Sequence, residues 1–310
     1  MRLSGRKPGL VLGGTAVAAA IAAACLPRIA QDPGYHLFAD ARTILGIPNG
    51  LNVLSNVAFA VVALAGLRLL ARGDAVVRES GERWAWVVFF VGVGLTSLGS
   101  AWYHLAPSND TLVWDRLPMA VAFLALLAAT VAERVGPELG ARLLGPMVLS
   151  GIGGVFYWVA TERAGAGDLR PYVLVQFFPL FAIPLLLLLY RPRYSHGWHY
   201  LVVLGLYALA KIAELADGAI FRATGWVSGH TLKHLLAAAA VGTLAWMLSQ
   251  RRSFTLPPAL KMSPGQTFTA QRTRGIRTRS VRAPRDRCDL HLRSGSDAPG
   301  GIVPPTPCRA

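Results

Sequence analysis

Charged residues are scarce in this chain, and acidic residues are the scarcest of them. Only 15% of the 310 residues are charged, with 16 Asp or Glu against 31 Lys or Arg. Hydrophobic residues make up 53% of the chain, the mean hydropathy is +0.43, and the apolar residues form long blocks. This composition excludes an ordinary soluble domain. It predicts an all-α integral membrane protein, because blocks of about 18 apolar residues can cross the hydrocarbon core as helices.

Cysteine is also nearly absent. Cys25, Cys288 and Cys308 have neither the spacing of metal ligands nor that of a disulfide framework. The net charge of +15 raises the possibility of a nucleic-acid partner, but 12 of the basic residues follow Gln250, against three Asp. A basic segment after a membrane helix is typical of a cytoplasmic anchor, and no nucleic-acid-binding fold is visible in it. We therefore expect no nucleic-acid partner.

The apolar blocks predict eight membrane segments. The first, Gly9 to Leu26, follows a basic start and is either a cleaved signal peptide or a retained helix. We favour the retained helix, because the chain lacks the large aliphatic residue usual three positions before a lipoprotein cysteine. The other segments lie near 52–71, 84–105, 117–133, 143–160, 171–190, 198–216 and 229–249.

Three parts of the chain follow from this pattern. Residues 1–34 are an N-terminal helix and connector, residues 35–250 form a membrane domain, and residues 251–310 form a disordered basic tail. With the N-terminus in the cytoplasm, most basic residues fall on the cytoplasmic side, as the positive-inside rule requires. The C-terminal tail is then cytoplasmic as well.

Five polar residues stand out at the ends of these apolar segments. Ser100 and His104 are four residues apart and share one helical face, and Asp115 heads the next segment. His230 and His234 repeat the four-residue spacing at the head of the last segment. The predicted topology places all five at the extracytoplasmic face. We refer to them as the five-residue set.

Three imidazoles are a sufficient ligand set for catalytic Zn²⁺, which makes hydroxide available at about pH 7. We expect His104, His230 and His234 to be the ligands. Asp115 would accept a proton from the attacking water, and Ser100 would bond that water or stabilise the oxyanion. Two histidines on one helical face often have no such role. Ionisable residues within membrane segments, however, are costly and tend to be functional.

The five-residue set resembles the alkaline ceramidase family. This family belongs to the CREST group of seven-helix membrane hydrolases, which also includes the progestin and adipoQ receptors. Asn52-Val-Leu-Ser55-Asn56 is similar to the Asn-x-x-Ser-Asn of the ceramidases, and the resemblance covers about residues 35–250. It departs from the family at Asp40 to Asn49, which has one carboxylate and no tryptophan, so we do not expect the calcium loop of eukaryotic members.

The resemblance implies a seven-transmembrane-helix CREST-type bundle, here preceded by one extra N-terminal helix. It also implies a zinc-dependent amidase with the ligands and assisting residues given above. The substrate would be a membrane lipid with an N-acyl chain, such as ceramide, cleaved to a fatty acid and a free amine. The oligomeric state is left open.

Two other functions remain possible on the sequence. One is a CREST-type lipid-sensing receptor with a structural zinc site. The other is a transporter that uses Lys211 and Glu214 as a relay, although the chain has no internal repeat or pair of broken helices. We expect these two residues to neutralise each other inside the bundle instead.

Overall fold

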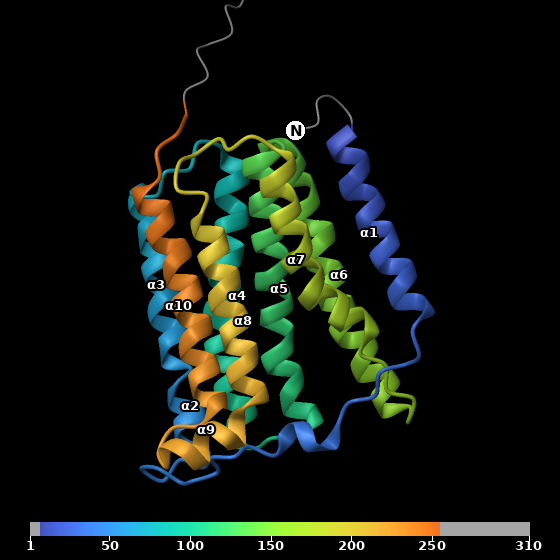
Figure 1. Cartoon of the computed structure of the whole chain (residues 1–310), viewed down its shortest axis with the longest axis vertical. Coiled ribbons are helices and arrows are strands. Elements are labelled where there is room, and N and C mark those ends of the chain that lie inside the picture. Colours follow the sequence, from blue (N-terminus) through green and yellow to red (C-terminus); the bar gives the residue numbers. More distant parts are fainter. Residues whose placement is uncertain (1–6, 255–310) are drawn as a thin grey trace, which may run out of the picture. The chain divides into compact units, whose positions relative to one another are not determined.

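The computed structural model describes residues 7–254, which are almost entirely helical (Figure 1). Within that range the only β-structure is two isolated bridges. The helices are α1 (Lys7–Cys25), η1 (Pro33–His36), α2 (Gly50–Leu54), α3 (Val57–Arg72), α4 (Ser80–Leu105), α5 (Asn109–Arg134), α6 (Pro137–Arg163), α7 (Arg170–Leu189), α8 (His199–Leu215), α9 (Asp217–Thr224) and α10 (Gly229–Gln250). The prediction of a disordered basic tail falls almost wholly outside the described residues.

Six of these helices are long and apolar enough to cross a membrane, counting α2 and α3 together as Gly50–Arg72. The other five are α4, α5, α6, α7 and α10. The described part of the chain is thus an all-α protein that can span a membrane several times. The apolar part of α1, Gly9–Cys25, and the 17 residues of α8 are shorter. The count of seven core helices plus one extra helix therefore remains a prediction.

The two ends of the bundle differ in what covers them. The connector, residues 26–49, passes across one end together with α2 and α9 (Figure 1). We call this the connector end, and the opposite end, where α10 finishes at Gln250, the far end. The most extensive helix contacts are those of α4 with α5, of α5 with α6 and of α8 with α10, and α1 packs against α7.

Helix α5 begins earlier than the sequence pattern predicted. Ser108 accepts a hydrogen bond from the backbone N–H of Thr111, whose hydroxyl in turn accepts one from the backbone N–H of Ser108. This reciprocal capping starts the helix at Asn109, within a polar stretch that the apolar pattern read as loop. The prediction that Asp115 heads its helix was therefore wrong, since Asp115 lies almost two turns inside α5.

Two glycines allow the close helix contacts that build the connector end. A Cβ on Gly99 would lie 1.8 Å from the carbonyl oxygen of Trp114, so α4 and α5 meet backbone to backbone there. A Cβ on Gly229 would lie 2.0 Å from the carbonyl oxygen of Ala213, so the start of α10 meets the end of α8. Both contacts lie one residue away from members of the five-residue set.

Candidate metal centre

Three histidines from two helices converge at the connector end. His104 lies in the last turn of α4, and His230 and His234 lie in the first two turns of α10. One ring nitrogen from each lies within 4.8 Å of the other two, and the residues are only 1%, 5% and 3% exposed. The Nε2 atoms of His104 and His230 are 3.2 Å apart. The predicted convergence is confirmed, and the cluster can hold a metal ion.

Ser55 sets which nitrogen of His234 is free. Its hydroxyl donates to the carbonyl oxygen of Asn52 at 3.0 Å, so its oxygen is left to accept a hydrogen bond from His234 Nδ1 at 2.7 Å. With Nδ1 protonated, Nε2 of the neutral ring keeps its lone pair. A hydrogen bond of this kind is what orients a metal-ligating imidazole. The serine of the Asn-x-x-Ser-Asn motif therefore acts directly on a ligand.

The connector and α9 fix the helix ends that carry His104 and His230. The side chain of Asn49 donates to the carbonyl oxygen of His104 at 2.9 Å. Asp217 accepts the backbone N–H of His230 at 2.7 Å and that of Ala39 at 2.9 Å. These bonds satisfy backbone groups that helix ends leave without an intrahelical partner. They also tie α4 and α10 to the same short stretch of chain.

Asn52 joins the motif to α10. Its side-chain oxygen accepts a hydrogen bond from Thr231, which follows His230 in the first turn of α10, at 2.8 Å. Its side-chain nitrogen donates to the carbonyl oxygen of Asp40 at 3.2 Å. Asn52 is fully buried, so both bonds are made out of contact with solvent. The connector, α2 and the start of α10 are thereby held together around the imidazoles.

Aromatic residues enclose the triad. The ring of Phe38, from the connector, lies 4.7 Å from that of His104 and 4.6 Å from that of His230. Sequence reasoning missed Phe38, because a single aromatic residue in a connector has no spacing that identifies it. His36 makes hydrogen bonds to Tyr103 and Asn109, both at 3.0 Å.

Asp115 and Ser100 are brought together at the Gly99 contact. Asp115 is 8% exposed and Ser100 is 2% exposed, and the backbone nitrogen of Asp115 would lie 3.3 Å from a Cβ on Gly99, the neighbour of Ser100. Ser100 is one turn from His104 on α4, so all of the five-residue set lies at the connector end. Asp115 and His234 line the same cavity. The catalytic roles of Asp115 and Ser100 stay predictions.

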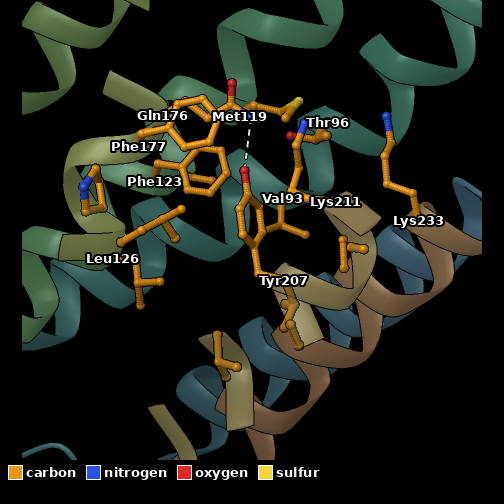
Figure 2. A pocket seen from close by; sticks show the side chains of 18 of the residues that line it. Val93, Thr96, Met119, Phe123, Leu126, Gln176, Phe177, Tyr207, Lys211 and Lys233 are labelled. Atoms are coloured by element: carbon orange, nitrogen blue, oxygen red, sulfur yellow. Dashed lines mark hydrogen bonds between the residues drawn. The ribbon is translucent and has the colours of Figure 1, made fainter. Parts of the chain in front are cut away.

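This cavity has a volume of about 280 Å³ and mostly apolar walls. It extends from His234 at one end to Leu244 at the other, which are ten residues and about 15 Å apart along α10. Gln176 of α7 donates to the hydroxyl of Tyr207 of α8 at 3.0 Å within it (Figure 2). Phe123 and Phe177 also line the cavity (Figure 2). We call this space the lipid cavity.

The predicted pairing of Lys211 and Glu214 is present, with a third member. Glu214 accepts hydrogen bonds from Lys211 and also, at 2.9 Å, from Lys233. Lys233 directly precedes His234 on α10, and all three charged residues line the lipid cavity. Sequence reasoning missed Lys233 and also Arg116, which follows Asp115. The sequence signal that could have identified them is that each directly adjoins a member of the five-residue set.

The fold and the site define a helical membrane protein with a buried three-histidine centre next to an apolar cavity. Comparisons with models of protein families, with curated proteins and with solved structures found no match.

Proposed function

We propose that this protein is a zinc-dependent membrane amidohydrolase that cleaves the N-acyl amide bond of ceramide or a ceramide-like lipid. The observation that carries the proposal is the convergence of three buried imidazoles, one of which, His234, lines an apolar cavity that is also lined by the carboxylate of Asp115. The bundle would be of the seven-helix CREST type, with α8 as its shortest member and α1 as an added helix. The metal centre would face the extracytoplasmic side and the basic tail the cytoplasm.

The spacing of the ring nitrogens supports zinc. Two ligands bound tetrahedrally at roughly 2.0–2.1 Å from one ion lie roughly 3.3 Å from each other. The Nε2 atoms of His104 and His230 are 3.2 Å apart. Burial also favours neutral imidazoles, the form that binds metal. Bound there, zinc supplies Lewis-acid polarisation of the amide carbonyl and hydroxide at neutral pH.

Asp115 is the group placed to move protons. In the hydrolysis, water adds to the amide carbonyl, the C–N bond breaks, and the nitrogen leaves as an amine after gaining a proton. Asp115 accepts the proton of the attacking water and passes it to the leaving nitrogen. Ser100, on the adjoining helix, bonds that water or stabilises the developing oxyanion. Phe38 covers the imidazoles and keeps bulk water out of the centre.

The lipid cavity accommodates the acyl chain. Its walls below His234 are apolar and include Ala237, Val241 and Leu244 of α10. Its volume of about 280 Å³ lies near the lower end of the range for small-molecule sites, roughly 300–1,000 Å³. A chain lying along α10 brings the amide carbonyl to the level of His234 and Asp115.

Metal analysis of the purified full-length protein tests the site. We expect one zinc ion per chain, and loss of that zinc in His104→Ala, His230→Ala and His234→Ala. His36→Ala is the matched control, because His36 lies at the same end but is hydrogen-bonded elsewhere. Zinc that persists in all three ligand variants would refute the centre.

Turnover separates the enzyme from a receptor-like protein with a structural zinc site. We expect the wild-type protein to release fatty acid from an N-acyl lipid. Asp115→Ala should lower the rate by about 10²–10⁴-fold, the usual contribution of a general base, while zinc stays bound. Stoichiometric zinc without turnover of any N-acyl lipid would instead favour the receptor-like function.

A further inference from the structure

Arg116 is a buried cation that the proposed hydrolysis does not use. It follows Asp115 in α5, is 5% exposed and lines the lipid cavity. Its Nη2 donates to the neutral amide oxygen of Gln31 at 2.7 Å, and its Nη1 is buried without a hydrogen-bond partner. None of the salt bridges within residues 7–254 includes Arg116. A guanidinium usually binds a carboxylate or phosphate through such donors.

Aromatic rings hold the guanidinium in place. The Cζ atom of Arg116 lies 4.3 Å from the ring centre of Trp158, 4.8 Å from that of Tyr172 and 5.5 Å from that of Tyr35. These rings come from α6, α7 and η1. They stabilise the cation by cation–π interactions but provide no negative charge. The guanidinium is therefore fixed in orientation, and its Nη1 is left without a hydrogen-bond partner.

Within residues 7–254, none of the other charged residues that line the cavity forms a salt bridge with Arg116. The lining includes three cationic side chains, Arg116, Lys211 and Lys233, and two carboxylates, Asp115 and Glu214. Both lysines donate to Glu214, and Figure 2 shows them extending in the same direction from neighbouring helices. The formal net charge of these five side chains is therefore +1. An unpaired charge inside a membrane protein is costly and usually marks a ligand site.

Arg116 also lies where a lipid headgroup would be. Helical side chains point towards the N-terminus of their helix, which for α5 is the connector end. The contact with Gln31 of the connector confirms this direction. The apolar part of the cavity extends the other way, to Leu244. An acyl chain in that part leaves the headgroup beside Arg116, with the amide between them near His234.

We infer that the headgroup of the lipid substrate carries a carboxylate, as in an N-acyl amino acid, and that Arg116 binds it. This inference rests on the proposed N-acyl amide hydrolysis, and among N-acyl lipids it selects those that have a carboxylate in place of the neutral headgroup of ceramide. A carboxylate has a single negative charge, which matches the single excess positive charge of the lining. A phosphomonoester, at about −1.5 to −2, would overcompensate it.

Equilibrium binding to the metal-free protein tests the inference. The full-length protein in detergent micelles is treated with a chelator, so that a metal ion cannot attract the anion. N-palmitoylglycine is compared with N-palmitoylglycinamide, which has the same shape without the charge. We expect the carboxylate to bind at least about tenfold more tightly, the effect of roughly one charge-assisted hydrogen bond. Equal affinities would overturn the inference.

Substitutions of Arg116 test whether this residue causes the preference for the carboxylate lipid. Arg116→Gln should bind both lipids equally, and Arg116→Lys should keep the preference for the carboxylate. Arg163→Gln is the matched control, because Arg163 is an exposed arginine at the same end that does not line the cavity. Its Nη2 lies 3.2 Å from the carboxylate oxygen Oδ1 of Asp110. If Arg116→Gln does not fold, the wild-type comparison and Arg116→Lys still decide. A preference that survives in folded Arg116→Gln contradicts the assignment.

Palmitate separates the substrate headgroup from the product. Its carboxylate sits where the amide of the substrate would be, so we expect weaker binding than for N-palmitoylglycine. Equal or tighter binding of palmitate would show that the cation holds the product, which overturns the inference. Turnover is scored separately with zinc. A carboxylate preference without turnover disproves the hydrolase alone, and turnover without the preference disproves this inference alone.

Discussion

Both ends of the bundle contain a buried polar cluster, but the two clusters differ in how completely they are satisfied. At the far end, Arg251 donates to Glu82 at 2.5 Å and to Glu133 at 2.9 Å. Tyr194 and Tyr200 donate to the same two carboxylates. At the connector end, imidazole nitrogens face one another, and His104 Nδ1 has no hydrogen-bond partner.

This difference separates a structural cluster from a binding site. Opposite charges and hydrogen bonds satisfy the cluster at the far end, so it has no capacity left for a ligand. The connector end retains one imidazole nitrogen, His104 Nδ1, and one donor, Arg116 Nη1, without a hydrogen-bond partner. Buried groups left unpartnered are unfavourable unless something binds them. We therefore assign stability to the far end and function to the connector end.

The largest effect is expected from breaking the far cluster. Arg251→Met leaves Glu82 and Glu133 buried without their shared cation, and removal of one partner of a buried pair costs about 3–5 kcal/mol. We expect that loss in the free energy of unfolding, measured by denaturant titration in detergent micelles. Arg252→Met is the control, because Arg252 is the next residue and is exposed. Equal stability of the two variants would contradict a structural role for the cluster.

A smaller and different effect is expected from Ser55→Ala at the connector end. The variant removes the acceptor for His234 Nδ1 while leaving the three ligands in place. Loss of such a partner typically lowers metal affinity by about 10–100-fold. Competition with a chelator measures this directly, and stability without metal should change little.

Ser97→Ala provides the comparison for Ser55→Ala. Ser97 is also buried and hydrogen-bonds the same motif, through the carbonyl oxygen of Asn56 at 2.9 Å, but it contacts none of the three imidazoles. The Ser97→Ala variant should bind zinc with the same affinity as the wild-type protein. An equal loss of affinity in both variants would mean that Ser55 acts through packing rather than on His234.

The sequence predicted those parts of the site that have a helical period. Spacings of four residues located Ser100 with His104 and His230 with His234, and the order of the apolar segments placed all of them at one end of the bundle. The start of α5 was missed, because the capping interaction of Ser108 lies within a polar stretch that looks like loop.

Contacts made across the bundle were not predictable in this way. Phe38 lies in the connector, and Arg116 is the residue after Asp115. Both contact the site only because of how the neighbouring helices pack. Lys233 stands between two predicted ligands, yet only the three-dimensional structure shows that it shares Glu214 with Lys211. Pairing between distant residues has no signature in a single sequence.

The smallest effect is expected at a second closed cluster, which joins α1 to the bundle. Asp168, between α6 and α7, is buried and accepts hydrogen bonds from Arg170 at 2.7 Å and Tyr157 at 3.1 Å. Arg170 also donates to the carbonyl oxygens of Ala24 and Leu26, at 2.9 Å and 2.7 Å. Asp168 and Arg170 thus link the end of α1 to the start of α7.

The stability provided by this cluster should depend on pH. The hydrogen bonds from Arg170 lower the pKa of Asp168 from 3.8 to about 2. A depressed carboxyl pKa stabilises the folded state fully above the unfolded value of about 4, and this contribution is lost as the pH falls towards about 2. We expect Asp168→Asn to lower the thermal midpoint by a constant amount above about pH 5 and by progressively less below about pH 4. A difference that persists unchanged to about pH 2 would mean that the Asp168 carboxylate contributes no stability through its charge, and that α1 is held by its packing against α7 alone.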